Sequence, residues 1–384
     1  MAQRVRTDWV LFGTILALAA GGMIVLWSAA SVLGESRHGS SLFFGLRQLQ
    51  WAVVSLGLMM LLKTIDYRRL NHPIFVFPAV SLILGLLAVV YLLDSSHRWI
   101  RLGPLNLQPS EFAKPVLILF VAYLVSRRGA AINDRKYTLL PAAAIVGLIA
   151  GLVVRPDLGT AAVLAVTAIS VFLVAGLNWR NVLVAILICL VFGAAEIVRK
   201  PYRIGRIFGF FDPTYSVLDT RLAHHLDPEG RLKAYLQRNA PTDNADYHLK
   251  QSLIAVGSGG VLGKGPMRST QKLLYLPEAH TDFIYAVLAE EYGLLGSLLA
   301  MTGFLIIFWR GLRIYFRTQD EFGKCLALGV STLILFQALM NISVVIGLGP
   351  TKGIPLPLVS YGGSSLMSTL ICLGLLQSVG DHSA

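Results

Sequence analysis

The sequence predicts an all-α polytopic membrane protein with about ten transmembrane helices and a large extracytoplasmic loop. Of its 384 residues, 55% are hydrophobic and only 14% are charged, whereas soluble domains carry roughly 25% charged residues. The apolar residues come in runs that approach the roughly 20 residues needed to cross a bilayer. Charged or turn-forming residues separate these runs. We therefore expect one membrane domain over residues 1–384 and exclude a soluble globular protein.

In chain order, the apolar runs predict spans at residues 9–33, 47–64, 74–93, 111–126, 139–154, 159–177, 181–198, 283–309, 322–346 and 357–379. The first run is too long for the apolar core of a signal peptide, and no cleavage site of small residues follows it. We expect it to remain as the first helix.

Lys and Arg in the short loops predict the orientation, because the cytoplasmic side of a membrane protein carries the excess. With an inner N-terminus, the short outer loops hold only Arg37, Arg47, Arg98, Arg101, Arg155 and Lys352, and most of the other basic residues face the cytoplasm. Both termini are therefore expected to be cytoplasmic.

The exceptional connection is residues 199–281, between the seventh and eighth spans, which is expected to lie outside. It holds twelve Lys or Arg residues, and long loops are exempt from the charge rule. The part from 213 to 250 looks like a solvated insertion, while the part from 251 to 281 mixes apolar residues with glycines and looks packed against the membrane domain. The basic residues indicate an anionic partner at the outer membrane face.

Glu111 and Lys114 lie at the start of the fourth span. Their i, i+3 spacing puts them on one helix face, where their charges can neutralise each other. Ionisable groups at the edge of a span are expensive and indicate function. The alternative is an ordinary helix start, with Ser110 as the cap and Lys114 reaching out to the interface.

Two further segments place polar residues near the outer surface. The short connection RPDLGTA (155–161) carries Asp157, which either belongs to a site or caps the sixth helix. The segment GLGPTKGIPLPLVSYGGSSL (347–366) carries Ser360, and its prolines and glycines predict a loop that dips into the membrane domain before the last helix. Close helix packing explains its small residues equally well.

The stretch LPEAHTDFIYAVLAEE (276–291) places Glu278, His280, Thr281 and Asp282 directly before the eighth span. Asp282 could simply cap that helix, with Thr281 as a helper. Lys264, Arg268 and Lys272 precede it closely and favour a site instead. The nearby run GSGGVLGKG does not have the spacing of a phosphate-binding loop.

Cys189, Cys325 and Cys372 fall in or beside apolar segments without paired spacing. They predict core thiols, with neither a disulfide nor a zinc site.

These segments together resemble the SEDS family, the polytopic FtsW/RodA/SpoVE proteins of bacterial cell-wall synthesis, and the form of two motifs is most similar to the FtsW branch. The matching residues are RWIRLGPLNLQPSEFAK (98–114), RPDLGTA (155–161), YRIGRIFGFFDP (202–213), QSLIAVGSGGVLGKG (251–265), STQKLLYLPEAHTDFIYAVLAEEYG (269–293) and PTKGIPLPLVSYGGSS (350–365).

The resemblance implies a peptidoglycan glycosyltransferase that polymerises lipid II at the outer face of the bacterial cytoplasmic membrane during cell division. It implies a class B penicillin-binding protein transpeptidase and other division proteins as partners, with no nucleic acid. It also implies that Asp282, the acid of the HTDF motif, is essential.

The reaction joins a sugar hydroxyl to the C1 of a sugar that leaves undecaprenyl diphosphate, so it needs a general base and cations for the diphosphate. Asp282 at the membrane–water boundary suits the base. The cations expected to bind diphosphate are Arg203, Arg206, Lys264, Arg268 and Lys272, and solvated loop charges are the alternative for each.

Glu278, His280, Thr281, Glu111, Lys114, Asp157 and Ser360 complete the expected substrate-binding set. A divalent cation, Mg²⁺ or Mn²⁺, could share the task with Asp282 or Glu278 as its ligand.

Two other functions fit the same pattern. A lipid II flippase would also need a polytopic bundle with buried polar groups, but a transporter places its charges near the bilayer midplane. Here most of the charges lie at the outer boundary, which favours the enzyme. In a non-catalytic division scaffold, Asp282 would be only a helix cap.

Overall fold

The structure, a computed structural model, describes residues 7–94, 96–102, 105–212, 234–236, 238, 243–273, 275–350 and 353–382. Within these residues, nine helices are long and apolar enough to cross a membrane, and the apolar helix Leu158–Val174 is shorter. The chain is a multi-pass membrane protein, and its all-α membrane fold is as the sequence predicts.

The first half of the chain forms helices that run back and forth, joined by short connections. Its elements are α1 (Trp9–His38), α2 (Phe43–Thr64), η1 (Tyr67–Leu70), α3 (Pro73–Leu93), β1 (Ile100–Leu102), β2 (Leu105–Leu107), α4 (Pro109–Arg128), η2 (Gly129–Ala131), η3 (Arg135–Leu139), α5 (Leu140–Val154) and α6 (Leu158–Val174).

In the described part of the second half, one long helix precedes the long predicted loop, two of the helices named below lie within it and three long helices follow it. Its elements are α7 (Trp179–Val198), α8 (Pro201–Phe211), α11 (Asp243–Gly259), α12 (Ile284–Arg317), α13 (Glu321–Val345) and α14 (Gly363–His382).

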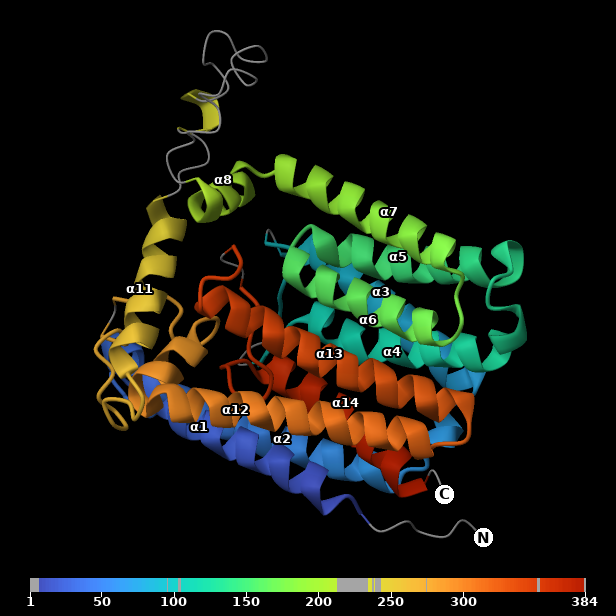
Figure 1. Cartoon of the computed structure of the whole chain (residues 1–384), viewed down its shortest axis with the longest axis horizontal. Coiled ribbons are helices and arrows are strands. Elements are labelled where there is room, and N and C mark those ends of the chain that lie inside the picture. The colour runs from blue at the N-terminus through green and yellow to red at the C-terminus, as the bar shows by residue number, and fades with distance from the viewer. Residues whose placement is uncertain are drawn as a thin grey trace.

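The centre of the bundle is formed by α4, α13 and α14. Between 72 and 78% of the residues in the apolar stretch of each of these helices are buried, against 11% for α7 at the edge. Figure 1 shows α7 on the outside of the bundle, followed by α8, with α11 across the end where α12 begins. The apolar side chains that α7 exposes, such as Leu187 and Phe192, are typical of a helix that faces lipid.

Ion pairs join the helix ends on the side of the bundle where α14 ends. Lys63 at the end of α2 contacts Asp381 at 3.7 Å, and Arg310 of α12 contacts Asp8, the N-cap of α1, at 2.6 Å. The start of α1 and the end of α14 therefore lie on the same side. That this side is the cytoplasmic one stays a prediction.

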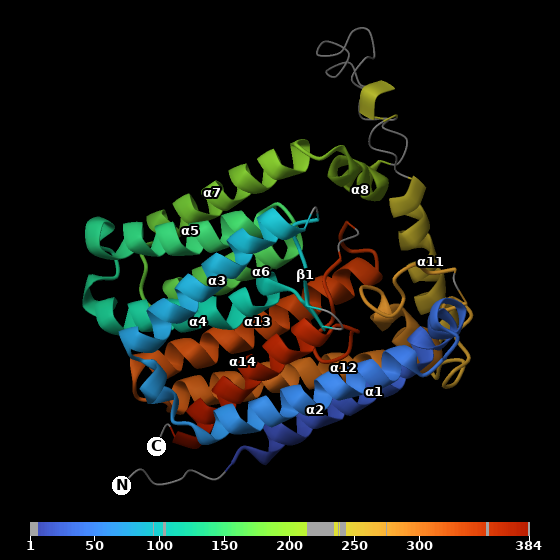
Figure 2. The ribbon, with the colours of Figure 1, turned by 180° about the vertical axis from the view of Figure 1, so that it is seen from behind.

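Several boundaries differ from the predicted ones for local reasons. The last helix begins at Gly363 and not at 357, because residues 353–362 form a buried, non-helical loop. A loop that dips into the membrane domain was expected in this segment. An antiparallel hairpin, β1 with β2, precedes α4 and was not predicted, because each of its strands has only three residues. Figure 2 shows β1 at the end of the bundle where α8 and α11 lie.

The predicted loop 199–281 contains helices α8 and α11, and α11 packs on α12. Most of the expected insertion 213–250 lies outside the described residues, as does Lys352.

The three cysteines are free thiols, as predicted. Cys325 and Cys372 are buried, but the expectation of a core position is wrong for Cys189, which is exposed on α7.

Candidate active site

A polar cavity of about 380 Å³ lies where α4 and α14 begin. Four carboxylates and two guanidinium groups surround it, together with aromatic and small polar residues. The lining consists of Arg47, Trp51, Arg98, Trp99, Asn106, Gln108, Glu111, Asp157, Glu278, His280, Thr281, Asp282, Gly353, Pro355, Tyr361, Gly362, Gly363, Ser364 and Ser365. The chain thus gathers residues from distant segments around one concave site, the usual form of a ligand pocket.

The segment that carries Asp282 is held by hydrogen bonds from two other parts of the chain. Asn341 of α13 donates to the carbonyl of Asp282 at 2.8 Å and to that of Ile354 at 2.7 Å. The buried Ser360 hydroxyl donates to the carbonyl of Thr281 at 2.6 Å, and the Tyr361 amide donates to that of His280 at 3.0 Å. The backbone of the segment is therefore fixed independently of its side chains.

Asp282 does not cap α12. The N-cap of that helix is Phe283, whose side chain makes no capping hydrogen bond. The Asp282 carboxylate instead faces the cavity, next to Gly353, where a Cβ atom would lie 2.6 Å from Asp282 Oδ2. In the part of the chain that the structure describes, no hydrogen bond or ion pair reaches this carboxylate.

Burial raises the pKa of Asp282 to about 7, and the negative charges of Glu278 and Asp157 add to the effect. The positive charges of Arg98 and Arg206 act in the opposite direction on the pKa. Desolvation of a carboxylate favours its neutral form, and nearby like charges do the same. Asp282 is thus a carboxyl group whose affinity for a proton is matched to neutral pH, as a general base requires.

Asp157 has both of the roles considered for it. It caps α6 by accepting hydrogen bonds from the amide and hydroxyl of Thr160, at 3.0 and 2.9 Å. It also lines the cavity, where its carboxylate meets Arg98 Nη2 at 3.2 Å. The capping residue therefore fixes a guanidinium group at the site.

Glu111 and Lys114 form the expected pair, but not at the interface. Lys114 Nζ lies 2.7 Å from Glu111 Oε2 and 3.0 Å from Gln337 Oε1 of α13, and the Lys114 side chain is 2% exposed. The alternative in which Lys114 reaches out to the interface is wrong, and so is the cap at Ser110, because the N-cap is Gln108. Glu111 lines the cavity, whereas Lys114 lies behind it.

His280, Thr281 and Glu278 complete the loop. Burial lowers the pKa of His280, and its ring packs near Phe44 and Tyr361, with centroids 5.4 and 5.8 Å away. The Thr281 hydroxyl donates to the Glu278 carboxylate at 2.9 Å. All three residues line the cavity, as their place in the sequence predicts.

The cations expected for a diphosphate do not line the cavity. Arg203 is buried and donates to the carbonyls of Val154, Arg155 and Glu196. Lys264 and Lys272 pair with glutamates of α12. Arg206 and Arg268 are exposed outside the cavity lining, although the charge of Arg206 influences Asp282. Ser360 is buried outside the cavity lining, where its hydroxyl donates to the backbone carbonyl of Thr281.

Arg47 and Arg98 are the basic residues of the cavity that the sequence interpretation did not select. Arg98 lies in the motif RWIRLGP, whereas Arg47 is one of the basic residues expected in the short outer loops. Arg47 and Trp51 also line an apolar groove of about 1550 Å³ between α2, α3, α4 and α14. The groove and the polar cavity therefore meet at these two residues.

A metal site is not evident from the side chains. Within the described segments, no group of three His, Cys, Asp or Glu residues is placed to hold a metal ion. Asp282 and Glu278 do line the same cavity. The divalent cation that the sequence suggested stays a prediction, and the chemistry below is derived from the chain's own residues.

Comparison with known proteins decides the family. The family model FTSW_RODA_SPOVE, described as "Cell cycle protein", matches residues 8–384. This chain belongs to the FtsW/RodA/SpoVE family.

Relatives within this family match the chain over nearly its whole length. "Probable peptidoglycan glycosyltransferase FtsW" of Trichlorobacter lovleyi is 34% identical, over 97% of this chain and 92% of that protein. "Stage V sporulation protein E" of Bacillus subtilis is 34% identical, over 99% of both chains.

Two solved structures share the fold. Thermus thermophilus rod shape determining protein RodA aligns with a TM-score of 0.67 and 26% identity, covering 99% of both chains. A chain from a structure described as "Structural coordination of polymerization and crosslinking by a peptidoglycan synthase complex" aligns with a TM-score of 0.72 and 27% identity, covering 98% of both chains.

Proposed function

We propose that this protein is a peptidoglycan glycosyltransferase that polymerises lipid II, with Asp282 as the general base. The observation that carries the proposal is the Asp282 carboxylate, whose pKa is raised to about 7, in a polar cavity that meets an apolar groove. The names of the full-length relatives support the same reaction class.

The shapes of the two hollows suit an amphiphilic substrate. An isoprenoid tail needs an apolar surface open toward the bilayer, and the groove between α2, α3, α4 and α14 offers one. A sugar diphosphate needs charged and polar groups, and the cavity offers Arg47 and Arg98 with several hydroxyls and amides. The junction at Arg47 and Trp51 would then hold the diphosphate that links the tail to the sugars.

Each step of the transfer has a residue suited to it. The 4-hydroxyl of the acceptor sugar attacks C1 of the donor sugar, and the Asp282 carboxylate takes the hydroxyl proton. The bond from C1 to the diphosphate oxygen breaks, and undecaprenyl diphosphate leaves with the bonding electrons. Arg98 would stabilise the charge that develops on this leaving group, because a guanidinium group binds phosphate oxygens through a planar fork.

Location and partners follow from the same proposal. The cavity would lie at the outer face of the bacterial cytoplasmic membrane, with both termini in the cytoplasm. A class B penicillin-binding protein would crosslink the glycan strands, which is supported by the neighbour described as a complex that coordinates polymerization and crosslinking. The FtsW names among the relatives support a role at the division site, together with other division proteins.

The proposal is tested with purified protein and its cognate transpeptidase in liposomes that contain lipid II. Glycan strands should accumulate, detected by gel electrophoresis of labelled product. Movement of lipid II across the bilayer without polymer would make the protein a transporter, and neither activity would favour a scaffold.

Arg98 offers a test of diphosphate binding. Replacing Arg98 by Gln should raise the KM for lipid II about tenfold or more, because a hydrogen bond to a charged group contributes about 1.5–3 kcal/mol. Arg98→Lys keeps the charge but loses the planar fork, so its KM for lipid II should lie between those of the native protein and Arg98→Gln. An unchanged KM in Arg98→Gln would remove this residue from the binding site.

The pH dependence of polymerisation tests the state of Asp282. The base acts when deprotonated, so kcat/KM should rise as the pH rises through about 7 and then level off, if the pKa of Asp282 is raised to about 7. Because the charge of Glu278 helps to raise that pKa, Glu278→Gln should move the rising limb to lower pH. A limb that stays in place, or moves to higher pH, would contradict this assignment.

The Asp282 carboxyl group also makes the stability of the fold depend on pH, in the direction opposite to that of activity. Its pKa is about 7 in the folded protein and 3.8 as the ordinary value, so folding favours the protonated form. The resulting contribution to stability is complete below about pH 4 and is lost as the pH rises through 7. The ionised base is thus held in place at a cost in stability.

A further inference from the structure

Helix α12 is interrupted close to the site, and another part of the chain completes its hydrogen bonding. Gly293 has φ 66° and ψ −162°, which no residue within a helix adopts. In a continuous helix the carbonyls of Glu290 and Glu291 would accept from the amides of Leu294 and Leu295. The break separates these partners and leaves four backbone groups to be satisfied elsewhere.

The glycine-rich segment 260–265 satisfies all four groups. The amides of Lys264 and Gly265 donate to the carbonyls of Glu290 and Glu291, both at 3.0 Å. The amides of Leu294 and Leu295 donate in turn to the carbonyls of Gly260 and Val261, at 2.9 and 3.2 Å.

The glycines of the run GSGGVLGKG permit this close approach of two backbones. A Cβ atom on Gly263 would lie 2.2 Å from the carbonyl oxygen of Glu291, and Gly263 has φ +81°. The run that did not fit a phosphate-binding loop therefore has a definite structural role.

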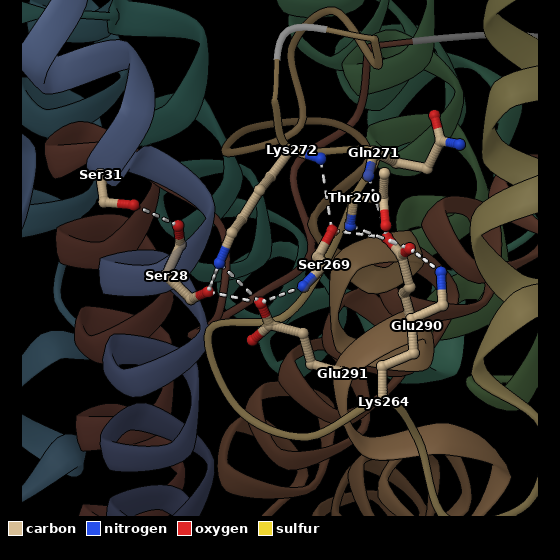
Figure 3. Close-up of polar contacts among 9 residues, drawn as sticks. All are labelled: Ser28, Ser31, Lys264, Ser269, Thr270, Gln271, Lys272, Glu290 and Glu291. Atoms are coloured by element: carbon tan, nitrogen blue, oxygen red, sulfur yellow. Dashed lines mark hydrogen bonds and ion pairs between the residues drawn. The ribbon is translucent and has the colours of Figure 1, made fainter.

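Side chains strengthen the same junction (Figure 3). Lys264 Nζ lies 2.6 Å from Glu290 Oε1, and Lys272 Nζ lies 3.0 Å from Glu291 Oε1. Glu290 also accepts from the Ser269 hydroxyl and from the amides of Thr270 and Gln271, while Glu291 accepts from the Ser269 amide. We call Lys264, Ser269, Lys272, Glu290 and Glu291 the clamp.

A third element joins the clamp from the start of the chain. The Ser28 hydroxyl of α1 donates to Glu291, and Lys272 Nζ lies 2.7 Å from Ser28 Oγ. Both glutamate side chains are fully buried. Residues 269–272 are thereby bonded to both α12 and α1.

The clamp encloses the segment that carries Asp282. Residues 273–283 lie between the clamped Lys272 and the start of α12, and the clamped glutamates follow Asp282 by eight and nine residues on the same chain. Eight helical residues span about 12 Å. No clamp residue lines the cavity, so the clamp acts on the site only through the position of this segment.

We infer that the Lys264–Glu290 and Lys272–Glu291 ion pairs are positioning elements of the reaction, which fix Asp282 relative to the cavity. The inference rests on the proposed function. Buried ion pairs add little net stability compared with apolar side chains, but they require a specific geometry. Because catalysis depends on placement to within about 1 Å, such geometry is of direct use at a site on a loop.

Two sets of variants test the inference. Lys264→Gln removes the cation that is 33% exposed and leaves Glu290 its hydroxyl and amide donors, so the protein should fold. Lys272→Met with Glu291→Gln removes both charges of the buried pair and keeps a side-chain oxygen that can accept from the Ser28 hydroxyl and the Ser269 amide, so no buried charge is left uncompensated. Arg310→Met is the matched control, since it removes an ion pair on α12 far from Asp282.

Two measurements are made on each variant, with the native protein alongside and the cognate transpeptidase present. Hydrogen–deuterium exchange reports on residues 276–283, whose amides at Leu276, Thr281 and Phe283 are hydrogen-bonded in the structure. Steady-state polymerisation, normalised to folded protein, separates kcat from KM.

The clamp variants should exchange faster at 276–283 and lose about tenfold or more in kcat, with KM for lipid II within about twofold of native. Arg310→Met should match the native protein both in exchange at residues 276–283 and in kcat and KM. Native-like exchange, or faster exchange with native-like kcat, would overturn the inference. A native protein that forms no polymer would refute the proposed function and the catalytic part of the inference, while exchange would still decide whether the clamp holds the segment.

Discussion

Replacing Lys114 by Met is expected to destabilise the protein by about 3–5 kcal/mol, the cost of leaving a buried carboxylate without its partner. Glu111 and Lys114 are each 2% exposed, and Gln337 is the other hydrogen-bond partner of the Lys114 ammonium group. Without the lysine, Glu111 would lie within the bundle as an uncompensated charge. Thermal unfolding of the purified protein in detergent measures the loss.

The chain offers a matched control for this prediction. Lys324 and Glu321 have the same i, i+3 spacing and a similar distance, 2.8 Å, but their side chains are 28 and 58% exposed. Lys324→Met should cost about 0–1 kcal/mol, as is usual for exposed pairs.

Burial of the charge can be tested separately from loss of the lysine. The double variant Glu111→Leu with Lys114→Met should recover most of the stability, because it leaves no buried charge. Equal losses in Lys114→Met and Lys324→Met would show that burial of the pair is energetically unimportant.

The sequence predicted the helices better than the contacts between them. Apolar runs mark the spans because a bilayer imposes the same length and polarity on each helix. The errors fall where tertiary structure overrides this signal. The apolar run that begins at 357 suggested the start of the last span there, yet residues 353–362 form a buried loop. Gln48 and Asn341 from other segments, and Ser360 of the loop itself, make hydrogen bonds to its backbone.

The sequence grouped the cavity residues that lie close together along the chain. Glu278, His280, Thr281 and Asp282 share one loop, and a short motif is enough to group them. Arg47 comes from α2, and nothing local distinguishes it from other charges near a helix end. Its place at the cavity depends on how α2 packs against α14.

Lys264 and Lys272 show the converse case, because they pair with glutamates away from the cavity. In sequence they are two cations shortly before the Asp282 motif, which suggested a diphosphate site. Their partners Glu290 and Glu291 follow 26 and 19 residues later, and Ser28 is 244 residues from Lys272. A break in α12 brings these groups together, and the periodicity of an apolar run does not reveal such a break.

Replacing Asp282 by Asn has the largest effect that we expect on activity. Asn has the same shape and fits beside Gly353, but it cannot take a proton from the acceptor hydroxyl. General base catalysis contributes about 10²–10⁴-fold, so polymerisation should fall by at least about a hundredfold. Asp282 does not cap α12, and the fold should therefore tolerate the change.

A carboxyl-to-amide control elsewhere shows that the effect is specific. Asp134 caps η3 by accepting from the amides of Lys136 and Tyr137, and Asn can accept the same bonds. Asp134 comes after the end of α4. That helix is about 30 Å long and begins at the cavity, so Asp134 lies far from it. Asp134→Asn should retain native activity and stability.

The most direct test is therefore glycan polymerisation from purified lipid II by native protein, Asp282→Asn and Asp134→Asn, each with the cognate transpeptidase and each shown to be folded. We predict polymer from the native protein and from Asp134→Asn, and at least about a hundredfold less from Asp282→Asn. Equal product from Asp282→Asn would contradict the central claim that this carboxylate is the catalytic base.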